Sequence, residues 1–128
     1  MGLRKVSLMS RNKAKGTSAE TAVVNYLNEH GFAAAERRAL AGAFDKGDIA
    51  GIRAVCIEVK AAKTYSIPAW LRETFIEKKN AKAEVAFLVV KPVGVGAKNA
   101  GNFWAIMTLE EMASLLRRAN YGDKVDES

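Results

Sequence analysis

The sequence contains one cysteine and one histidine among its 128 residues. The single cysteine, Cys56, excludes an internal disulfide and a metal site made of several cysteines, which fits a reducing cytosol. The single histidine, His30, falls in the last turn of a predicted helix, where the helix dipole explains it better than a role as general base. No apolar run approaches the roughly 18 residues of a membrane span, and no apolar segment follows the charged N-terminus as in a secretory signal. We therefore expect a soluble, cytoplasmic protein that does not enter a membrane.

Acidic residues are absent from the first 15 positions. This stretch supplies +5 of the net charge of +6, through Arg4, Lys5, Arg11, Lys13 and Lys15. Residues 16–128 carry 15 basic and 14 acidic residues, so they are nearly neutral. A basic arm on a neutral body suits nucleic-acid phosphates, with an attraction that weakens steeply in salt; the alternative is a solvated terminus that only aids solubility. The length suits one domain, so we divide the chain into a basic arm at 1–15, a domain at 16–120 and a flexible tail at 121–128.

Hydrophobic periodicity predicts three helices and five strands. The pair Thr17 and Glu20 forms a capping box at the start of the first helix, and Gly31 ends it. In chain order, the predicted elements are a helix at 17–30, strands at 32–38, 48–52 and 54–61, a helix at 68–83, strands at 84–91 and 102–107, and a helix at 108–118. This order, α-β-β-β-α-β-β-α, predicts an α/β fold with a mixed, twisted sheet flanked by helices.

The second predicted helix has an apolar stripe that should be buried. The stripe consists of Trp70, Leu71, Thr74 and Phe75. The charged residues of this helix are predicted to face outward: Glu73, Glu77, Lys78, Lys79 and Lys82.

The stretch GDIAGIRAVCIEVKAAK, at 47–63, contains the main candidates for a metal site and for catalysis. Alternation along the strand at 54–61 places Glu58 and Lys60 side by side on one face, and a hairpin with the preceding strand brings Asp48 to Glu58. Two carboxylates beside an ammonium group suit a hard divalent cation such as Mg²⁺ at a phosphate, with the Val59 carbonyl as a further ligand. The alternative is a solvated ion pair on the face of a strand. Asp45 is a weaker competitor for the role of Asp48.

These residues resemble the PD-(D/E)xK nucleases, and among them the archaeal-type Holliday junction resolvases, including phage versions. The resemblance covers roughly residues 13–116 and rests on KGTSAE at 15–20, the Gly-Phe pair that ends the first helix, GDI at 47–49 and EVK at 58–60. It implies a restriction-endonuclease-like fold with Asp48 and Glu58 as metal ligands, Lys60 at the attacking water, and Glu20 as a further contributor to the metal site. Two features depart from the family: Gly47 stands where a proline is usual, and the second helix lacks a glutamine.

The resemblance implies a Mg²⁺-dependent endonuclease, able to use Mn²⁺, that resolves four-way junctions as a homodimer on branched DNA. A cellular or phage-encoded enzyme of this kind would act in the cytoplasm. Alternatives are a related nuclease acting on flaps, ends or duplex DNA, and a non-catalytic basic domain that binds nucleic acid. Glu20 is open to two interpretations, as a metal-site residue or as a helix cap. The candidate DNA-binding residues are Arg11, Lys13, Lys15, Arg37, Arg38, Lys63 and Tyr65.

Overall fold

The computed structural model describes residues 8–39 and 44–124, with side chains from residue 13 onward. Residues 1–7 of the predicted basic arm, the side chain of Arg11 and residues 125–128 of the predicted tail therefore lie outside the described residues. Within the described ranges, no helix is both long and apolar enough to cross a membrane.

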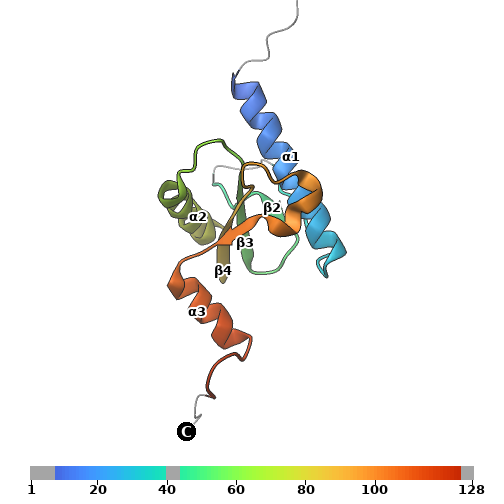
Figure 1. Cartoon of the computed structure of the whole chain (residues 1–128). Helices are drawn as coiled ribbons and strands as arrows, with labels where there is room; N and C mark the ends of the chain where they lie inside the picture. Colours follow the sequence, from blue (N-terminus) through green and yellow to red (C-terminus); the bar gives the residue numbers. More distant parts are fainter. Residues whose placement is uncertain (1–7, 40–43, 125–128) are drawn as a thin grey trace, which may run out of the picture.

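The described chain is a mixed α/β structure with two small sheets (Figure 1). Its elements are α1 (Leu8–Glu29), β1 (Glu36–Arg37), β2 (Ile49–Ala50), β3 (Val55–Lys60), α2 (Ile67–Ala81), β4 (Val85–Val90), the 3₁₀ helix η1 (Ala97–Asn102), β5 (Trp104–Ile106) and α3 (Leu109–Arg118). β1 and β2 form an antiparallel pair. β3 and β4 are parallel, and β5 joins the other edge of β4 antiparallel. The α/β class is confirmed, but two sheets replace the predicted single sheet.

Helix α1 begins at Leu8, so the predicted start at Thr17 is wrong. The preceding residues include good helix formers, and Gly16 inside the helix costs only about 1 kcal/mol. Thr17 and Glu20 lie within the helix, where the Thr17 carbonyl accepts a hydrogen bond from the Thr21 hydroxyl at 2.9 Å. A residue in a helix interior cannot cap its N-terminus, so the interpretation of Glu20 as a cap is also wrong.

The first predicted strand, at 32–38, is reduced to β1. Its earlier residues form a turn instead, in which the Phe32 N–H donates to the Leu27 carbonyl at 2.9 Å. The side-chain amide of Asn28 donates to the carbonyls of Phe32, Ala33 and Ala35 at 3.0–3.2 Å. Because a side chain satisfies these carbonyls, they do not need a partner strand.

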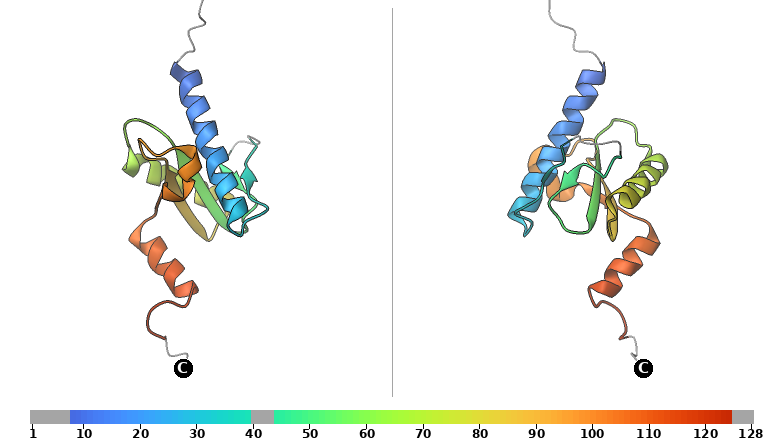
Figure 2. Two further views of the ribbon diagram at one scale, coloured as in Figure 1. Left: turned by 45° about the vertical axis from the view of Figure 1, so that its right-hand side comes forward. Right: turned by 180° about the vertical axis from the view of Figure 1, so that it is seen from behind.

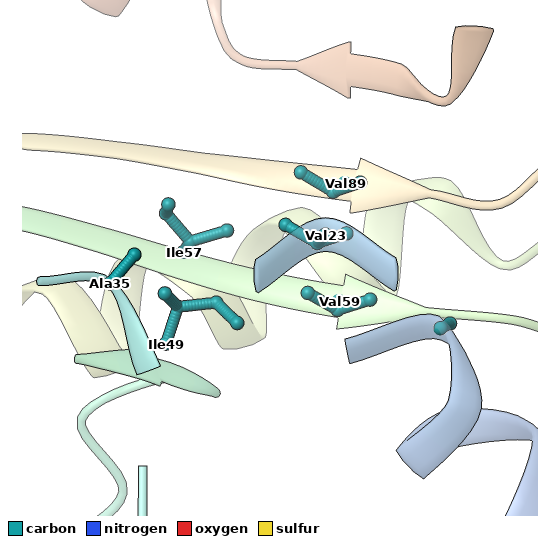
Figure 3. Packing of buried hydrophobic residues seen from close by; sticks show 7 residues of the cluster. Val23, Ala35, Ile49, Ile57, Val59 and Val89 are labelled. Carbon is teal, nitrogen blue, oxygen red and sulfur yellow. The ribbon is translucent and has the colours of Figure 1, made fainter. Parts of the chain in front are cut away.

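The core lies between α1 and one face of the β3–β4 pair (Figure 3). Alternation along β3 points Ile57 and Val59 to this face, where they meet Ala19 and Val23 of α1. Helix α2 packs against both β3 and β4 on the opposite side from α1. That second face of β3 carries Cys56, Glu58 and Lys60, so α2 covers the polar residues of the motif.

Helix α3 projects away from the sheets (Figures 1 and 2). Thr108 caps its N-terminus, since the Thr108 hydroxyl accepts a hydrogen bond from the Glu111 N–H at 3.2 Å. The Glu111 carboxylate ties the helix to the body through Lys78 of α2 and the backbone N–H of Ala86. Large apolar residues of α3 stay exposed within the described chain, with Leu109 84% and Leu116 43% exposed.

Candidate metal centre

Asp48 is held against the free edge of β3 by its own backbone and side chain. Its N–H donates to the Ile57 carbonyl at 2.8 Å, and its Oδ2 accepts from the Val59 N–H at 2.7 Å. These two bonds link β2 to β3 across an edge that no described strand occupies. The structure therefore brings Asp48 beside Glu58, but the predicted hairpin ladder is not formed, because β2 pairs with β1 and not with β3.

Gly47 allows this close approach. Its φ of +95° lies in the region that favours glycine, and a Cβ here would stand 3.0 Å from both the Ile57 carbonyl oxygen and Cys56 Sγ. Proline has φ fixed near −65°, so it cannot adopt this conformation. The presence of glycine rather than proline at this position thus has a local structural reason.

The carboxyl groups of Asp48 and Glu58 lie side by side, with Asp48 half-buried and Glu58 fully buried. Glu58 is 3% exposed. Burial raises the pKa of Asp48 to about 8, and the neighbouring Glu58 adds to the shift. Burial also raises the pKa of Glu58 to about 8, and Glu77 adds to this shift. A group of like charges removed from water needs protons or a cation to neutralise it.

Glu20 of α1 reaches the same place from the core side of the sheet. Burial raises the pKa of its carboxyl, with a further contribution from Asp48 that Arg37 only partly offsets. Arg37 Nε donates to Glu20 Oε2 at 3.0 Å. Glu20 is therefore placed to contribute to a metal site, while Arg37 is engaged with an acid rather than free for a phosphate.

Lys60 lies on the α2 face of β3, on the same side as Glu58. Its Nζ forms an ion pair with Glu73 of α2, with a nitrogen–oxygen distance of 3.1 Å. Burial acts to lower the pKa of Lys60, but the bond to Glu73 and the charge of Glu58 outweigh it, so the pKa is raised. Lys60 is thus charged at neutral pH and retains 28% exposure of its side chain.

Glu77 of α2 is the main residue that sequence reasoning missed. The prediction that it faces outward is wrong, because it is 1% exposed. Neither carboxylate oxygen has a hydrogen-bond partner within the described part of the chain. Glu77 follows Trp70 by seven residues and Thr74 by three, which places it on the same face of the helix. This spacing could have predicted its burial.

Four carboxylates converge between β3, α2 and the segment before β2. Asp45, Glu58, Glu73 and Glu77 each offer one oxygen, and these oxygens lie within 4.8 Å of one another. Asp45 is thus close to the site without replacing Asp48 at the edge of β3. The donor atoms are all carboxylate oxygens, which fit a hard divalent cation such as Mg²⁺, Mn²⁺ or Ca²⁺.

A basic hollow of about 490 Å³ lies at the carboxyl ends of β3 and β4. Lys15 of α1 and Lys63 line it together with Lys91, which the sequence interpretation did not select. This position follows from the parallel pairing of β3 and β4, because Lys63 and Lys91 both come after the ends of those strands. Two of the candidate DNA-binding residues are therefore brought together.

The remaining candidate DNA-binding residues have other surroundings. Lys13 is exposed on α1. Arg38 Nη2 donates to the Ile49 carbonyl at 3.4 Å, so this arginine is turned toward β2. The Tyr65 hydroxyl accepts a hydrogen bond from the Val93 N–H at 2.8 Å, and its ring packs edge-on against Trp70 and Trp104. Tyr65 thus has a structural role in fixing the loop after β4.

Comparison of the chain with protein-family models, with curated proteins and with solved structures found no match.

Proposed function

We propose that the chain is a divalent-metal-dependent DNA endonuclease of the PD-(D/E)xK type, with a restriction-endonuclease-like fold, that cuts four-way junctions. This proposal rests mainly on the proximity of Asp48, Glu58 and Lys60. The Asp48 carboxylate accepts a hydrogen bond from the Val59 N–H, which fixes it beside β3. Burial of two carboxyl groups side by side is unfavourable for folding, so the arrangement needs a further reason. Binding a cation at a phosphate supplies one.

Asp48 and Glu58 would hold Mg²⁺ or Mn²⁺, with Glu20 as a further contributor. The carbonyl of Val59 suits this role too. In an extended strand successive carbonyls point to opposite edges, and the Lys60 carbonyl accepts from Lys91 on the β4 side. The Val59 carbonyl therefore faces the edge where Asp48 lies. A bound divalent ion would polarise the phosphodiester and lower the pKa of a water molecule.

Lys60 would contribute positive charge where negative charge develops on the phosphate. In hydrolysis, the water oxygen bonds to phosphorus and the bond from phosphorus to the leaving sugar oxygen breaks. One product end then carries a phosphate and the other a hydroxyl. The raised pKa of Lys60 keeps its ammonium charged throughout, so its role is electrostatic and not that of a base.

The basic hollow formed by Lys15, Lys63 and Lys91 would bind the phosphates that flank the cut. It opens beyond the end of β3, on the side where the motif strand leaves the site. The basic residues at 1–15 would extend this surface, and binding should weaken steeply with salt. Lysines bind phosphates without reading base sequence, which suits recognition of DNA shape.

Resolution of a symmetric junction requires two cuts related by a two-fold axis. We therefore propose a homodimer that presents two copies of the site to branched DNA in the cytoplasm. Light scattering of the purified protein tests this stoichiometry. A monomer at the concentration where junctions are cut would contradict it.

The test of function is cleavage of a labelled synthetic four-way junction with Mg²⁺, beside a linear duplex made from the same arm sequences. Paired symmetric nicks near the branch point, with the duplex intact, would support the proposal. Cutting of both substrates would support a nuclease that acts on duplex DNA, flaps or ends. A shifted but uncut junction would indicate a nucleic-acid-binding domain whose acidic residues are structural.

A further inference from the structure

We infer that the carboxylates of Asp45, Glu58, Glu73 and Glu77 form a second divalent-cation site, beside the one assigned to Asp48. This inference goes beyond the proposed nuclease, since the site would bind a cation whether or not the chain cuts DNA. We call this group the α2 acidic cluster, because two of its four members lie on α2.

The strongest evidence for this site is the environment of the Glu77 carboxylate. Its side chain is 99% buried, and both carboxylate oxygens lack a hydrogen-bond partner within the described residues. Buried carboxylates are normally paired with a base, hydrogen-bonded or bound to a metal. The neighbours of Glu77 in the cluster are three further acids, so the surroundings lack the charge that Glu77 needs.

Lys60 lies next to the cluster, and its ammonium is paired with Glu73. One positive charge does not balance four carboxylates. A divalent cation would supply the missing charge and accept the unused oxygens of Glu77 at the same time.

The dimensions of the α2 acidic cluster suit one ion. Oxygens on opposite sides of a hard cation are separated by about 4–5 Å, twice the usual metal–oxygen distance. One oxygen from each of the four residues lies within 4.8 Å of all the others. Because each donor is a carboxylate, the expected cation is of the Mg²⁺, Mn²⁺ or Ca²⁺ class, and thiophilic metals are disfavoured.

The cluster is buried on one side and open to solvent on the other, so an ion has a route into it. Glu58 and Glu77 are buried at its base, whereas Asp45 is exposed and the Glu73 side chain is 42% exposed. An ion can therefore enter past Asp45 and Glu73. Asn80, one turn after Glu77 on α2, donates its side-chain amide to the Asp45 carbonyl at 2.8 Å and holds this entrance to the helix.

This site is separate from the one assigned to Asp48. Asp48 and Glu20 approach Glu58 from the free edge of β3 and from α1, and neither belongs to the α2 acidic cluster. Glu77 and Glu73 approach Glu58 from α2. Glu58 is shared, so variants of Glu58 cannot distinguish the two sites, whereas variants of Asp48 and Glu77 can.

The test counts bound Mn²⁺ in the full-length protein without DNA, using electron paramagnetic resonance of the free ion during titration. The wild type should bind two ions per chain. Glu77→Gln and Asp45→Asn should each lose one ion, or weaken it at least tenfold, and Asp48→Asn should lose the other. The control is Glu110→Gln on the exposed surface of α3, which should keep both ions. Circular dichroism checks the fold of each variant.

The outcomes separate this inference from the proposed function. If Glu77→Gln and Asp45→Asn bind Mn²⁺ like the wild type, the α2 acidic cluster is not a cation site, even where Asp48→Asn loses an ion. If Asp48→Asn binds normally and Glu77→Gln does not, the cluster holds the ion and the metal assignment at Asp48 fails. Asp45 is exposed, so Asp45→Asn decides the question if Glu77→Gln does not fold.

Discussion

The carboxylate of Asp48 accepts a hydrogen bond from the backbone N–H of Val59 at 2.7 Å. A side chain thus takes the position of a neighbouring strand at the free edge of β3 and fixes its carboxylate next to Glu58. Glu58 and Lys60 both belong to β3, and Asp48 is hydrogen-bonded to this strand, so the three motif residues are held together. Such fixed placement would suit the catalytic roles proposed for these residues.

Removal of either motif carboxylate should abolish cleavage without loss of DNA binding. We expect Asp48→Asn and Glu58→Gln each to lower the cleavage rate at least about 100-fold, because each removes a ligand charge at the reacting phosphate. The measurement is single-turnover cleavage together with a gel-shift titration in Ca²⁺. The control Glu110→Gln should cleave normally, and retained cleavage in Asp48→Asn would refute the assignment.

Loss of the Lys60 charge should slow the chemical step more than binding. We expect Lys60→Gln to lower the cleavage rate about 10²–10³-fold with little change in the dissociation constant for DNA. Lys60→Arg, which keeps the charge, should retain more activity. If Lys60→Gln instead weakens DNA binding and cleaves bound DNA at the normal rate, Lys60 belongs to the binding surface.

The metal-free protein should lose stability as the pH rises from 5 to 8. The pKa is raised to about 8 in Asp48 and Glu58 and to about 7 in Glu77, mainly by burial. Between pH 4 and 8 the folded state therefore holds protons that the unfolded state has released, and stability falls with pH. Thermal unfolding in EDTA measures this slope.

Addition of Mn²⁺ at pH 8 should restore the lost stability, because the cation replaces the protons. Glu77→Gln should flatten the slope and stabilise the metal-free protein at pH 8 by about 1–3 kcal/mol. Glu110→Gln should leave the slope unchanged. A melting temperature that rises from pH 5 to pH 8 in EDTA would show that these carboxyl groups are not protonated together.

Substitution of Gly47 should disturb both folding and the site. In Gly47→Ala the positive φ costs about 1–3 kcal/mol, and the new Cβ would press on the Ile57 carbonyl oxygen at 3.0 Å. The matched control is Gly31→Ala, which has a φ of +100° but no atom within 4 Å of the Cβ. Urea unfolding should show a larger loss for Gly47→Ala. Equal losses would mean that the contact with β3 is unimportant.

The lysines of the basic hollow should determine part of the salt dependence of DNA binding. Replacement of Lys15, Lys63 or Lys91 with glutamine should each reduce the slope of log affinity against log salt by about 0.9. Lys79→Gln, on the exposed surface of α2, should leave the slope unchanged. Unchanged slopes in all three variants would place the DNA elsewhere.

Local sequence patterns predicted much of the candidate site. Alternation along 54–61 placed Glu58 and Lys60 on one face, and the short strand before it brought Asp48 alongside. The helix predicted at 108–118 is found as α3 at Leu109–Arg118. These features depend on residues close in the chain, so periodicity and capping rules capture them.

The α2 acidic cluster and the basic hollow could not be predicted in this way. The charge of Glu77 led to the prediction that it faces outward, although its spacing from Trp70 and Thr74 placed it on the buried stripe of α2. Lys91 and Lys15 are distant in sequence, and only the parallel pairing of β3 with β4 and the packing of α1 bring them together. Helix α1 began earlier than its capping signal because good helix formers precede Thr17.

The sequence by itself determined the α/β class and the placement of Glu58 and Lys60 on one face of a strand, because side-chain type and strand alternation are local properties. The tertiary structure decided that α2 would lie over the polar face of β3. That placement buried Glu77 against Glu58, drew in Asp45 and Glu73, and turned a pair of carboxylates into a larger acidic site. Which helix covers which face depends on contacts between distant segments, and no local pattern in the chain specifies it.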